Sequence, residues 1–136
     1  MQREARSSGA TPLILTTAVY YAPNVNRVNH PIQAIAKSLD WINLMAYDFS
    51  GPTRSTVTNS PAALYDPSSQ VSGSYGIRAW IQASLSANKL VFRIPFYGYA
   101  WHLMNANNHG LLAPANGPVG STDGSMRYQQ ITKFIT

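Results

Sequence analysis

The sequence predicts an α/β fold built around a parallel β-sheet. Three mostly apolar segments, residues 13–21, 40–49 and 90–97, have the composition of strands that are covered on both faces. Segments with a helical spacing of apolar residues separate these strands. The alternation of strand and helix, together with the right-handed rule for crossover connections, makes neighbouring strands parallel.

Helical spacing occurs in three places along the chain. The first helix is expected to begin at Pro31, because proline is favoured in the first turn of a helix. The third helix follows a turn at residues 123–125. The apolar stripes of the three helices are Ile32, Ile35, Ala36 and Leu39, then Ile77, Trp80, Ile81 and Leu85, and finally Tyr128, Ile131, Phe134 and Ile135.

The composition of the 136 residues excludes several classes of protein. There are ten basic and five acidic residues, for a net charge of +5, and there is no cysteine. Disulfide frameworks, cysteine-based metal sites and thiol catalysis are therefore excluded. The basic residues are spread singly along the chain rather than grouped into a stripe, so we expect no nucleic-acid partner.

The sequence contains no sign of a membrane span or a cofactor site. No apolar run approaches the ~20 residues that a membrane span needs. The opening residues carry charges where a signal peptide would carry its apolar segment, so we expect no secretory signal in this chain. His30, His102 and His109 lack the spacing of metal ligands, and neither a phosphate-binding loop nor a nucleophile elbow occurs. We therefore expect no metal and no cofactor.

Aromatic residues gather where the three expected strands end, at residues 20–23, 45–49 and 95–101. The carboxyl ends of parallel strands meet at one edge of a sheet, and α/β proteins bind their ligands at that edge. A long stretch without periodicity, residues 50–74, follows the second strand at the same edge. Rings with polar tips suit sugars. Two alternatives stay open: the rings could fill a β-rich core, and the loop could be a solvated insertion.

The second expected strand has two different faces. Alternation places Ile42, Leu44 and Ala46 on an aliphatic face that suits helix packing. The opposite face suits a pocket better than a dry core, because an unpartnered buried amide costs about 1–3 kcal/mol. Asp48 ends the run, either as a ligand-binding acid or as a strand-end cap. The residues of the opposite face are Trp41, Asn43, Met45, Tyr47 and Phe49.

Asp48 has no partner in the sequence that could serve as a second catalytic carboxylate. Asp40 lies on the same expected strand at a distance of roughly 26 Å, whereas the two carboxylates of a glycosidase stand about 5–9.5 Å apart. Asp66 and Asp123 occur in Asp-Pro-Ser and Asp-Gly turns, and Glu4 lies in a charged terminal segment. The sequence therefore contains no plausible general acid.

Four segments in order, residues 39–49, 65–69, 71–77 and 95–101, resemble plant class V chitinases of glycoside hydrolase family 18. The resemblance implies an α/β fold that is part of a TIM (β/α)8 barrel, covering the segments of strands five to seven. It also implies that residues 1–101 form this partial barrel, and that residues 102–136 form the beginning of an α+β insertion subdomain.

The resemblance implies a retaining, substrate-assisted mechanism, in which the N-acetyl oxygen of the substrate attacks the anomeric carbon. It assigns catalytic positions to Tyr47, whose hydroxyl would hold the acetamido oxygen, and to Asp48, which would hydrogen-bond the distorted sugar. Met45 would form a wall of the same subsite, with Asn43 as an inward-facing neighbour. Further candidates for sugar contacts are Tyr99, Trp101 and Tyr21.

Parts of the family pattern are absent from this sequence. The family's acid stands in an Asp-x-x-Asp-x-Asp-x-Glu motif, which does not occur here, and the tryptophan of strand eight is missing as well. Thr53-Arg54-Ser55 replaces a Gly-Trp-Ser-like loop, through sequence drift or through a changed sugar cleft. The unpaired outer strands are expected to make the free polypeptide marginally stable and prone to aggregation.

The resemblance implies a chitinase-type glycoside hydrolase that cleaves β-1,4-linked N-acetylglucosamine polymers when its chain is complete. This chain is expected to be a fragment without hydrolytic activity, because the motif of the general acid is absent. The alternatives are a non-catalytic chitin-binding lectin on the same scaffold and an inactive truncated product. The expected partners are chitin or N-acetylglucosamine oligosaccharides, with no membrane, and the complete protein is expected to be a monomer. The resemblance implies an extracellular or vacuolar location.

Overall fold

The computed structural model describes residues 7–25 and 28–135, which form two compact units. The first unit consists of Met1–Met45 and Ile77–Arg93, and the second of Ala46–Gly76 and Ile94–Thr136. Glu4 lies outside the described residues. The division expected between residues 101 and 102 comes from the family resemblance and stays a prediction.

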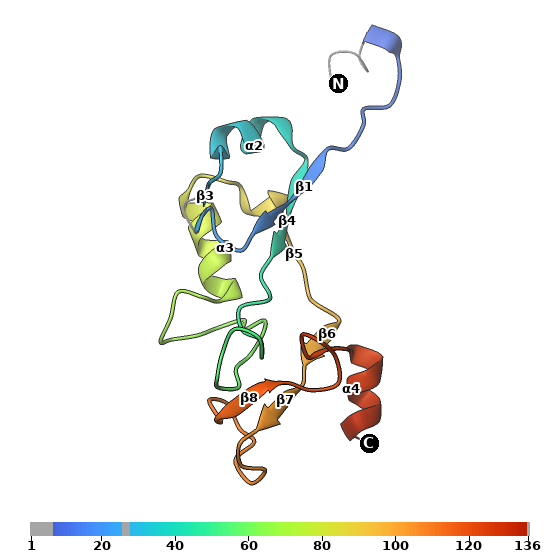
Figure 1. Cartoon of the computed structure of the whole chain (residues 1–136). Helices are drawn as coiled ribbons and strands as arrows, with labels where there is room; N and C mark the ends of the chain where they lie inside the picture. The colour runs from blue at the N-terminus through green and yellow to red at the C-terminus, as the bar shows by residue number, and fades with distance from the viewer. Residues whose placement is uncertain (1–6, 26–27, 136) are drawn as a thin grey trace. The chain divides into compact units, whose positions relative to one another are not determined.

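The first unit is built on a three-stranded parallel sheet. Strands β1 (Thr16–Tyr20), β4 (Trp41–Met45) and β5 (Leu90–Phe92) lie side by side in that order (Figure 1). The central strand β4 is parallel to both neighbours, and Tyr20 is in register with Met45 at its carboxyl end. The predicted α/β class and the parallel direction of the strands are therefore confirmed.

Two helices cover the same face of this sheet. Helix α2 (Ile32–Ser38) begins directly after Pro31, as predicted, and α3 (Gly73–Gln82) precedes β5. Figure 1 shows both helices on one side of the strands. The core between helices and sheet contains Val19, Ile35, Ile42, Leu44, Trp80 and Leu85.

Short elements complete the first unit. Strands β2 (Asn24–Val25) and β3 (Val28–Asn29) form an antiparallel pair. The 3-10 turn η1 (Ala87–Lys89) leads into β5. The ammonium group of Lys89 donates two hydrogen bonds of 2.7 Å to backbone carbonyls at the C-terminal end of α2. Because carbonyls at a helix end lack partners within the helix, Lys89 stabilises that end.

The central strand β4 has the two faces that its alternation predicts. Ile42 and Leu44 have no exposed surface, and both belong to the core under the helices. The residues that alternate with them, Trp41, Asn43 and Met45, are half-buried. The aliphatic face of the predicted strand is therefore confirmed as the helix-packing face.

The first strand is shorter than the sequence predicts. It begins at Thr16 rather than at residue 13. The backbone N–H of Leu15 donates to the side-chain carboxylate of Asp40 over 2.7 Å, and this side chain takes the place of a strand partner. Leu13 and Ile14 lie before this point and are exposed.

The other two strands also end early, for local reasons. Strand β4 ends at Met45 rather than at residue 49, because its neighbours end there: Met45 pairs with Tyr20, the last residue of β1, and Leu44 pairs with Phe92, the last residue of β5. The third predicted strand is two separate elements, since β5 ends at Phe92 and β6 (Tyr97–Tyr99) belongs to the second unit. Pro95 lies between them and has no N–H group to extend a ladder.

The second predicted helix ends before its last apolar residue. Helix α3 stops at Gln82, and Ser84 has a φ of 73°, so Leu85 joins the core from outside the helix. Trp80 is fully buried as predicted, whereas Ile81 is 43% exposed. The prediction that Ile81 belongs to the buried stripe is wrong, because that residue lies about 100° further around the helix than Trp80.

The second unit contains two antiparallel strand pairs and one helix (Figure 1). Strand β6 pairs with β9 (Ser125–Arg127), and β7 (Trp101–Leu103) pairs with β8 (Ala115–Pro118). Helix α4 (Tyr128–Ile135) follows β9 directly. The third predicted helix is therefore confirmed. It contacts both β6 and β9.

The long loop predicted at residues 50–74 contains no strand and leads into α3 at Gly73. It is nevertheless ordered by contacts within the second unit. Val57 forms an isolated antiparallel bridge with Pro114. The Thr58 hydroxyl donates to the Gly110 carbonyl over 2.7 Å. These contacts attach the loop to the segment that precedes β8.

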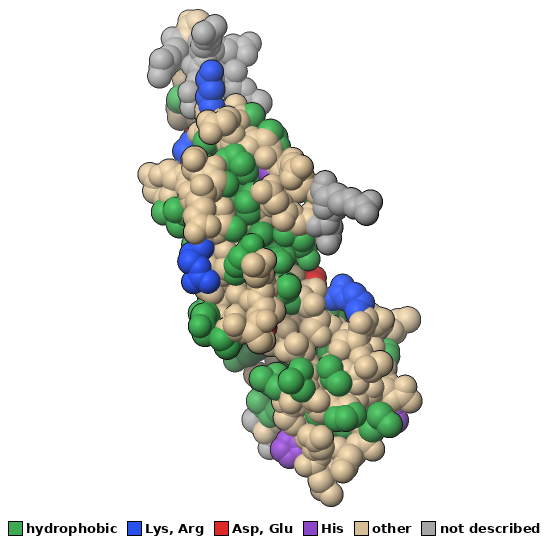
Figure 2. Space-filling view, turned by 90° about the vertical axis from the view of Figure 1, so that its left-hand side faces the viewer, with side chains coloured by type: hydrophobic (Ala, Val, Ile, Leu, Met, Phe, Trp, Pro, Cys, Tyr) green, Lys and Arg blue, Asp and Glu red, His purple; other side chains and the backbone are tan. Residues whose placement is uncertain are grey.

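The charged side chains are sparse on the surface. On the face drawn in Figure 2, Lys and Arg side chains lie apart from one another rather than in a stripe. Among the helices of the described residues, none has both the length and the apolar character that crossing a membrane requires.

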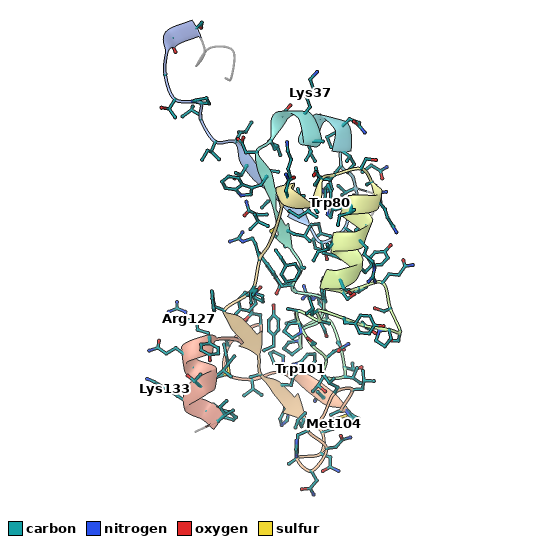
Figure 3. All side chains as sticks on the ribbon, turned by 180° about the vertical axis from the view of Figure 1, so that it is seen from behind. Lys37, Trp80, Trp101, Met104, Arg127 and Lys133 are labelled. Carbon is teal, nitrogen blue, oxygen red and sulfur yellow. The ribbon has the colours of Figure 1, made fainter. Side chains whose placement is uncertain are left out.

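Substitution of Trp80 tests the core of the first unit. Its indole is fully buried beside the sheet, and the indole N–H donates to the Tyr20 carbonyl over 3.3 Å (Figure 3). We expect Trp80→Ala to lower the free energy of unfolding by about 3–5 kcal/mol, because it leaves a cavity. Urea unfolding followed by far-UV circular dichroism measures this loss. The control Ile81→Ala is expected to lose about 1 kcal/mol or less, and equal losses would contradict the prediction.

A pair of glycines tests the packing of the second unit. Gly124 has a φ of 77°, and an added Cβ would lie 2.6 Å from Cγ of Pro52 and 2.7 Å from the Ala100 carbonyl oxygen. Gly117 has a φ of 82°, but nothing lies within 4 Å of an added Cβ. Both Ala variants share a conformational cost of about 1–2 kcal/mol. We expect Gly124→Ala to lower the thermal midpoint further than Gly117→Ala, and similar shifts would argue against the close packing.

Candidate functional site

Asp48 is the centre of a hydrogen-bonded cluster in the second unit. The hydroxyl groups of Tyr97 and Tyr99 both donate to its Oδ1 atom, over 2.7 and 2.8 Å. All three side chains are half-buried. Hydrogen bonds to an ionised acceptor are about twice as strong as neutral ones. The two tyrosines therefore hold the carboxylate in one orientation.

The local sequence explains why the two tyrosines converge. Tyr97 and Tyr99 flank Gly98 in β6, so their side chains project from the same face of the strand. Gly98 faces helix α4, where an added Cβ would lie 3.1 Å from Cδ1 of Ile131. A glycine at this position thus lets α4 approach one side of the strand while both rings occupy the other.

Asp48 reaches the tyrosines because the chain turns sharply after β4. Its φ of 60° lies in the left-handed region, which Asp adopts more readily than most residues. Its carboxylate binds the tyrosines of β6 in the second unit. The role of Asp48 as a ligand-binding acid stays a prediction.

The environment keeps both tyrosines protonated. Burial raises the pKa of Tyr97 and the pKa of Tyr99, and the hydrogen bonds to Asp48 raise both further. The reason is that a phenolate beside a carboxylate is unfavourable. Both hydroxyls are therefore donors at neutral pH. Their contribution to stability is fully present below the ordinary tyrosine pKa and is lost as the pH rises through the raised values.

Tyr47, the second predicted catalytic residue, belongs to the same cluster. Its ring lies 6.3 Å from the ring of Tyr97 at an interplanar angle of 83°. Tyr97 and Tyr99 repeat this edge-to-face arrangement at 6.1 Å and 84°. Such geometry is favourable for aromatic pairs. The structure thus brings together three of the predicted site residues, Tyr47, Asp48 and Tyr99.

A cleft of about 450 Å³ opens beside this cluster. A pocket of this volume is within the range that holds small ligands. Asp48, Tyr97 and Tyr99 form one part of its wall, and the rest comes from β9, the turn before it and α4. Arg127 stands at the end of β9 (Figure 3). The additional lining residues are Asp123, Ser125, Met126, Arg127 and Gln130.

Asp123 lines the cleft but serves a turn, as the sequence predicts. The backbone N–H of Ser125 and the hydroxyl of Ser121 donate to its carboxylate over 3.0 and 3.1 Å, and these hydrogen bonds lower its pKa. The hydroxyl and the backbone N–H of Ser68 lower the pKa of Asp66 in the same way. Carboxyl groups that stay ionised cannot act as general acids near neutral pH.

Trp101, a predicted sugar contact, lines a different cavity in the second unit. This cavity has a volume of about 580 Å³ and mostly apolar walls. Tyr99 and Met126 line both the cavity and the cleft beside Asp48. Trp101 itself extends from β7 and does not line that cleft (Figure 3). Its role in sugar binding stays a prediction.

The remaining predicted residues belong to the first unit. The amide of Asn43 donates to the Thr17 carbonyl over 3.4 Å, so this polar group of β4 has a partner. Met45 lines a groove of about 450 Å³ together with Tyr20. Tyr21 is 6% exposed, and its ring lies 5.0 Å from that of Tyr20. The predicted sugar contacts of these three residues stay predictions.

Two residues of the cluster were not predicted from the sequence. Tyr97 precedes Tyr99 by two positions, and strand alternation places both on one face, so the choice of Tyr99 should have included Tyr97. Arg54 donates through Nη2 to the backbone carbonyl of Asp48 over 2.9 Å. This contact forms across an irregular loop, where no periodicity could indicate it.

The cluster is suited to binding a polar ligand. A fixed carboxylate accepts hydrogen bonds from hydroxyl groups, and phenol hydroxyls accept or donate to hydroxyl and amide groups. The tyrosine rings supply faces for C–H groups. In the part of the chain that the structure describes, no group of three or more His, Cys, Asp or Glu side chains is placed to hold a metal ion.

The sequence that forms this cluster matches a known family. The model of glycosyl hydrolases family 18 matches residues 1–135. A class V chitinase from Arabidopsis thaliana is 56% identical over 133 residues, which are 97% of this chain and 35% of that protein. The chain therefore spans about a third of the length of this curated relative.

Solved structures are similar over the same range. A class V chitinase mutant from Nicotiana tobaccum in complex with NAG4 has a TM-score of 0.92 and 56% identity, covering 98% of this chain and 40% of that one. A chitinase-like agglutinin from Robinia pseudoacacia has a TM-score of 0.86 and 36% identity, covering 98% of this chain and 39% of that one.

These matches confirm the resemblance to class V chitinases that four sequence segments predicted. They extend it from those segments to nearly every residue of the chain. The chain belongs to glycosyl hydrolases family 18.

Proposed function

We propose that this chain carries part of the sugar cleft of a chitinase-type glycoside hydrolase that acts on β-1,4-linked N-acetylglucosamine polymers. The observation that carries the proposal is the hydrogen-bonded cluster of Asp48, Tyr97 and Tyr99 beside a cleft of about 450 Å³. The similarity to a tobacco class V chitinase in complex with NAG4 supports the same substrate class.

Within this proposal the site residues have distinct roles in a retaining, substrate-assisted mechanism. The Tyr47 hydroxyl holds the acetamido oxygen of the sugar in position to attack the anomeric carbon, and Asp48 accepts a hydrogen bond from the distorted sugar. Pre-oriented groups of this kind reduce the entropy that the reaction must lose. The residues that line the sugar path are Met45 and Asn43, with further contacts from Tyr99, Trp101 and Tyr21.

The proposed architecture is a section of a (β/α)8 barrel. In such a barrel, consecutive strands are parallel neighbours and their connecting helices lie on one face. The order β1, β4, β5 and the shared face of α2 and α3 support this assignment to strands five to seven. Residues 1–101 then belong to the barrel, and residues 102–136 begin the α+β insertion.

We propose that the chain of 136 residues binds the sugar without cleaving it. The Asp-x-x-Asp-x-Asp-x-Glu motif does not occur in its sequence, and Asp123, the other carboxylate of the cleft, is held ionised in a turn. A chitin-binding lectin is the second candidate function. The similarity to a chitinase-like agglutinin from Robinia pseudoacacia favours it.

Binding and hydrolysis assays test the proposal directly. The purified chain is expected to bind N-acetylchitotetraose in isothermal titration calorimetry and to release no shorter oligosaccharide in chromatography of the mixture. Cellotetraose, which lacks the acetamido groups, is expected to bind more weakly. Measurable turnover would overturn the proposed inactivity, and equal affinity for the two sugars would argue against a site for the acetamido group.

Substitution of Asp48 locates the site. Asp48→Asn removes the charge that organises the two tyrosines, and we expect it to weaken N-acetylchitotetraose binding about tenfold, which corresponds to about 1.4 kcal/mol. Asp66→Asn is the matched control, because Asp66 is an acid in a turn that does not line the cleft. If the two variants bind the sugar equally well, the cleft beside Asp48 is not the binding site.

Substitution of Tyr47 separates catalysis from binding. In a longer protein that carries this segment and the acid motif, Tyr47→Phe is expected to lower kcat by about 10²–10³, as removal of one positioned hydrogen-bond donor does. The dissociation constant for the substrate is expected to change much less. Tyr65→Phe, at an exposed tyrosine, is the control. An equal loss of affinity and turnover would indicate a structural role for Tyr47.

A further inference from the structure

Arg54 binds the backbone of Asp48, whereas the tyrosines bind its side chain. Its Nη2 atom donates to the Asp48 carbonyl oxygen over 2.9 Å, whereas Tyr97 and Tyr99 bind the Oδ1 atom of the side chain. Asp48 thus has separate partners for its peptide group and its carboxylate. Its φ of 60° is a conformation that costs energy for a non-glycine residue, so it needs such contacts to persist.

The loop that carries Arg54 is itself well anchored. The backbone N–H groups of Arg54 and Ser55 both donate to the Gly51 carbonyl, over 3.0 and 3.1 Å. Gly51 and Pro52 are buried. The guanidinium therefore extends from a fixed turn rather than from a free loop, even though the Arg54 side chain is largely exposed.

Arg54 and Tyr99 share the space above Gly51. A Cβ added at Gly51 would lie 3.4 Å from Nη2 of Arg54 and 3.5 Å from ring atoms of Tyr99. The guanidinium and the phenol ring therefore rest on the same backbone segment. Arg54 binds the Asp48 carbonyl and Tyr99 binds the Asp48 carboxylate. The three residues are therefore connected to one another.

We propose that Arg54 is a positioning residue of the cleft, which holds the Asp48 peptide in the turn that presents its carboxylate to Tyr97 and Tyr99. Arg54 lies in the segment Thr53-Arg54-Ser55, which departs from the family's Gly-Trp-Ser-like loop. The contact between Arg54 and the Asp48 carbonyl is therefore a feature of the present chain. The inference rests on the proposed function for its consequence in sugar binding. The geometry of the cluster does not depend on that function.

A simpler role for Arg54 is that of a nearby positive charge. The groups that act on Tyr99 are Asp48, Arg54 and Asp123, and the charge of Arg54 lowers its pKa. The groups that act on Tyr97 are Asp48, Tyr99 and Tyr47. A nearby positive charge favours the phenolate, so loss of the Arg54 charge by itself cannot lower the pKa of either tyrosine. A lower pKa of Tyr97 after removal of Arg54 would therefore report a changed contact with Asp48.

Tyrosine ionisation distinguishes the two roles. The chain is labelled with ¹³Cζ-tyrosine, and the signals of Tyr97 and Tyr99 are assigned with their Phe variants. Native Tyr97 is expected to ionise at a higher pH than a free tyrosine, because burial and the hydrogen bond to Asp48 raise its pKa. In Arg54→Gln, we expect Tyr97 to ionise at lower pH, by about one unit, because the released carboxylate no longer accepts its hydrogen bond.

The alternative gives a different result. If Arg54 acts only as a charge, Arg54→Gln raises the midpoint of Tyr99 and raises that of Tyr97 or leaves it unchanged, which would overturn the proposal. Arg54→Lys keeps the charge and one donor, and it is expected to restore part of the native behaviour of Tyr97. In an Asp48→Asn background, Arg54→Gln is expected to have no further effect on Tyr97, since the acceptor it positions is already altered.

Controls separate this test from folding and from the proposed function. Arg78→Gln, at an exposed arginine of α3, is expected to leave both tyrosines unchanged. Circular dichroism verifies that each variant is folded at the pH used. If a variant unfolds in alkali, the exchange rate of the Tyr97 hydroxyl proton at pH 7 supplies the same answer, with faster exchange expected in Arg54→Gln.

The sugar is then examined separately. Arg54→Gln is expected to weaken N-acetylchitotetraose binding about three- to tenfold, and Arg78→Gln is expected not to change it. If the native chain binds no N-acetylchitotetraose, the proposed function fails, but the response of Tyr97 still decides the role of Arg54. If the native chain binds and Arg54→Gln binds equally well with an unchanged Tyr97, the inference about Arg54 fails while the proposed function stands.

Discussion

The candidate site of the second unit depends on one interaction: the Asp48 carboxylate accepts hydrogen bonds from the hydroxyls of Tyr97 and Tyr99. Asp48 lies in the segment that follows β4, and Tyr97 and Tyr99 lie in β6, 49 and 51 residues later. The backbone of Asp48 lies in the left-handed region where its carboxylate meets both hydroxyls. These hydrogen bonds connect the loop after β4 to β6.

Burial makes this cluster effective. Partial burial and the hydrogen bonds to Asp48 raise the pKa values of both tyrosines, so they remain donors. The carboxylate, held by these two donors, lines the adjoining cleft. A polar cluster that holds its own geometry needs little reorganisation when a sugar binds, which is the physical basis of pre-organised binding.

Much of the first unit could be predicted because its features are periodic. The alternation of β4 indicated which residues are buried, and Ile42 and Leu44 are indeed without exposed surface. The helix that begins after Pro31 follows from a spacing of three and four residues. The ends of the strands could not be predicted from periodicity, since they depend on single contacts such as that between Leu15 and the Asp40 carboxylate.

The candidate site was predicted in part, through the family resemblance rather than through periodicity. Tyr47, Asp48 and Tyr99 were found by resemblance, and the structure gathers them. Strand alternation places Tyr97 on the same face as Tyr99, but Tyr97 was not included in the predicted site. Arg54 depends on a loop conformation that has no repeating signal, and only the folded chain brings its guanidinium to the Asp48 carbonyl.

By itself, the sequence determined the α/β class and the faces of the central strand, because both depend on local periodicity. It also determined the family, because several segments match the family's sequences. The tertiary structure decided which acid meets the two tyrosines and which serves a turn. Asp48 accepts hydrogen bonds from two half-buried phenols, whereas Asp123 accepts them from neighbouring serine groups. The partners of Asp48 lie far from it in the sequence, so only the folded chain brings them together. The partners of Asp123 lie two residues from it, so the local turn is sufficient.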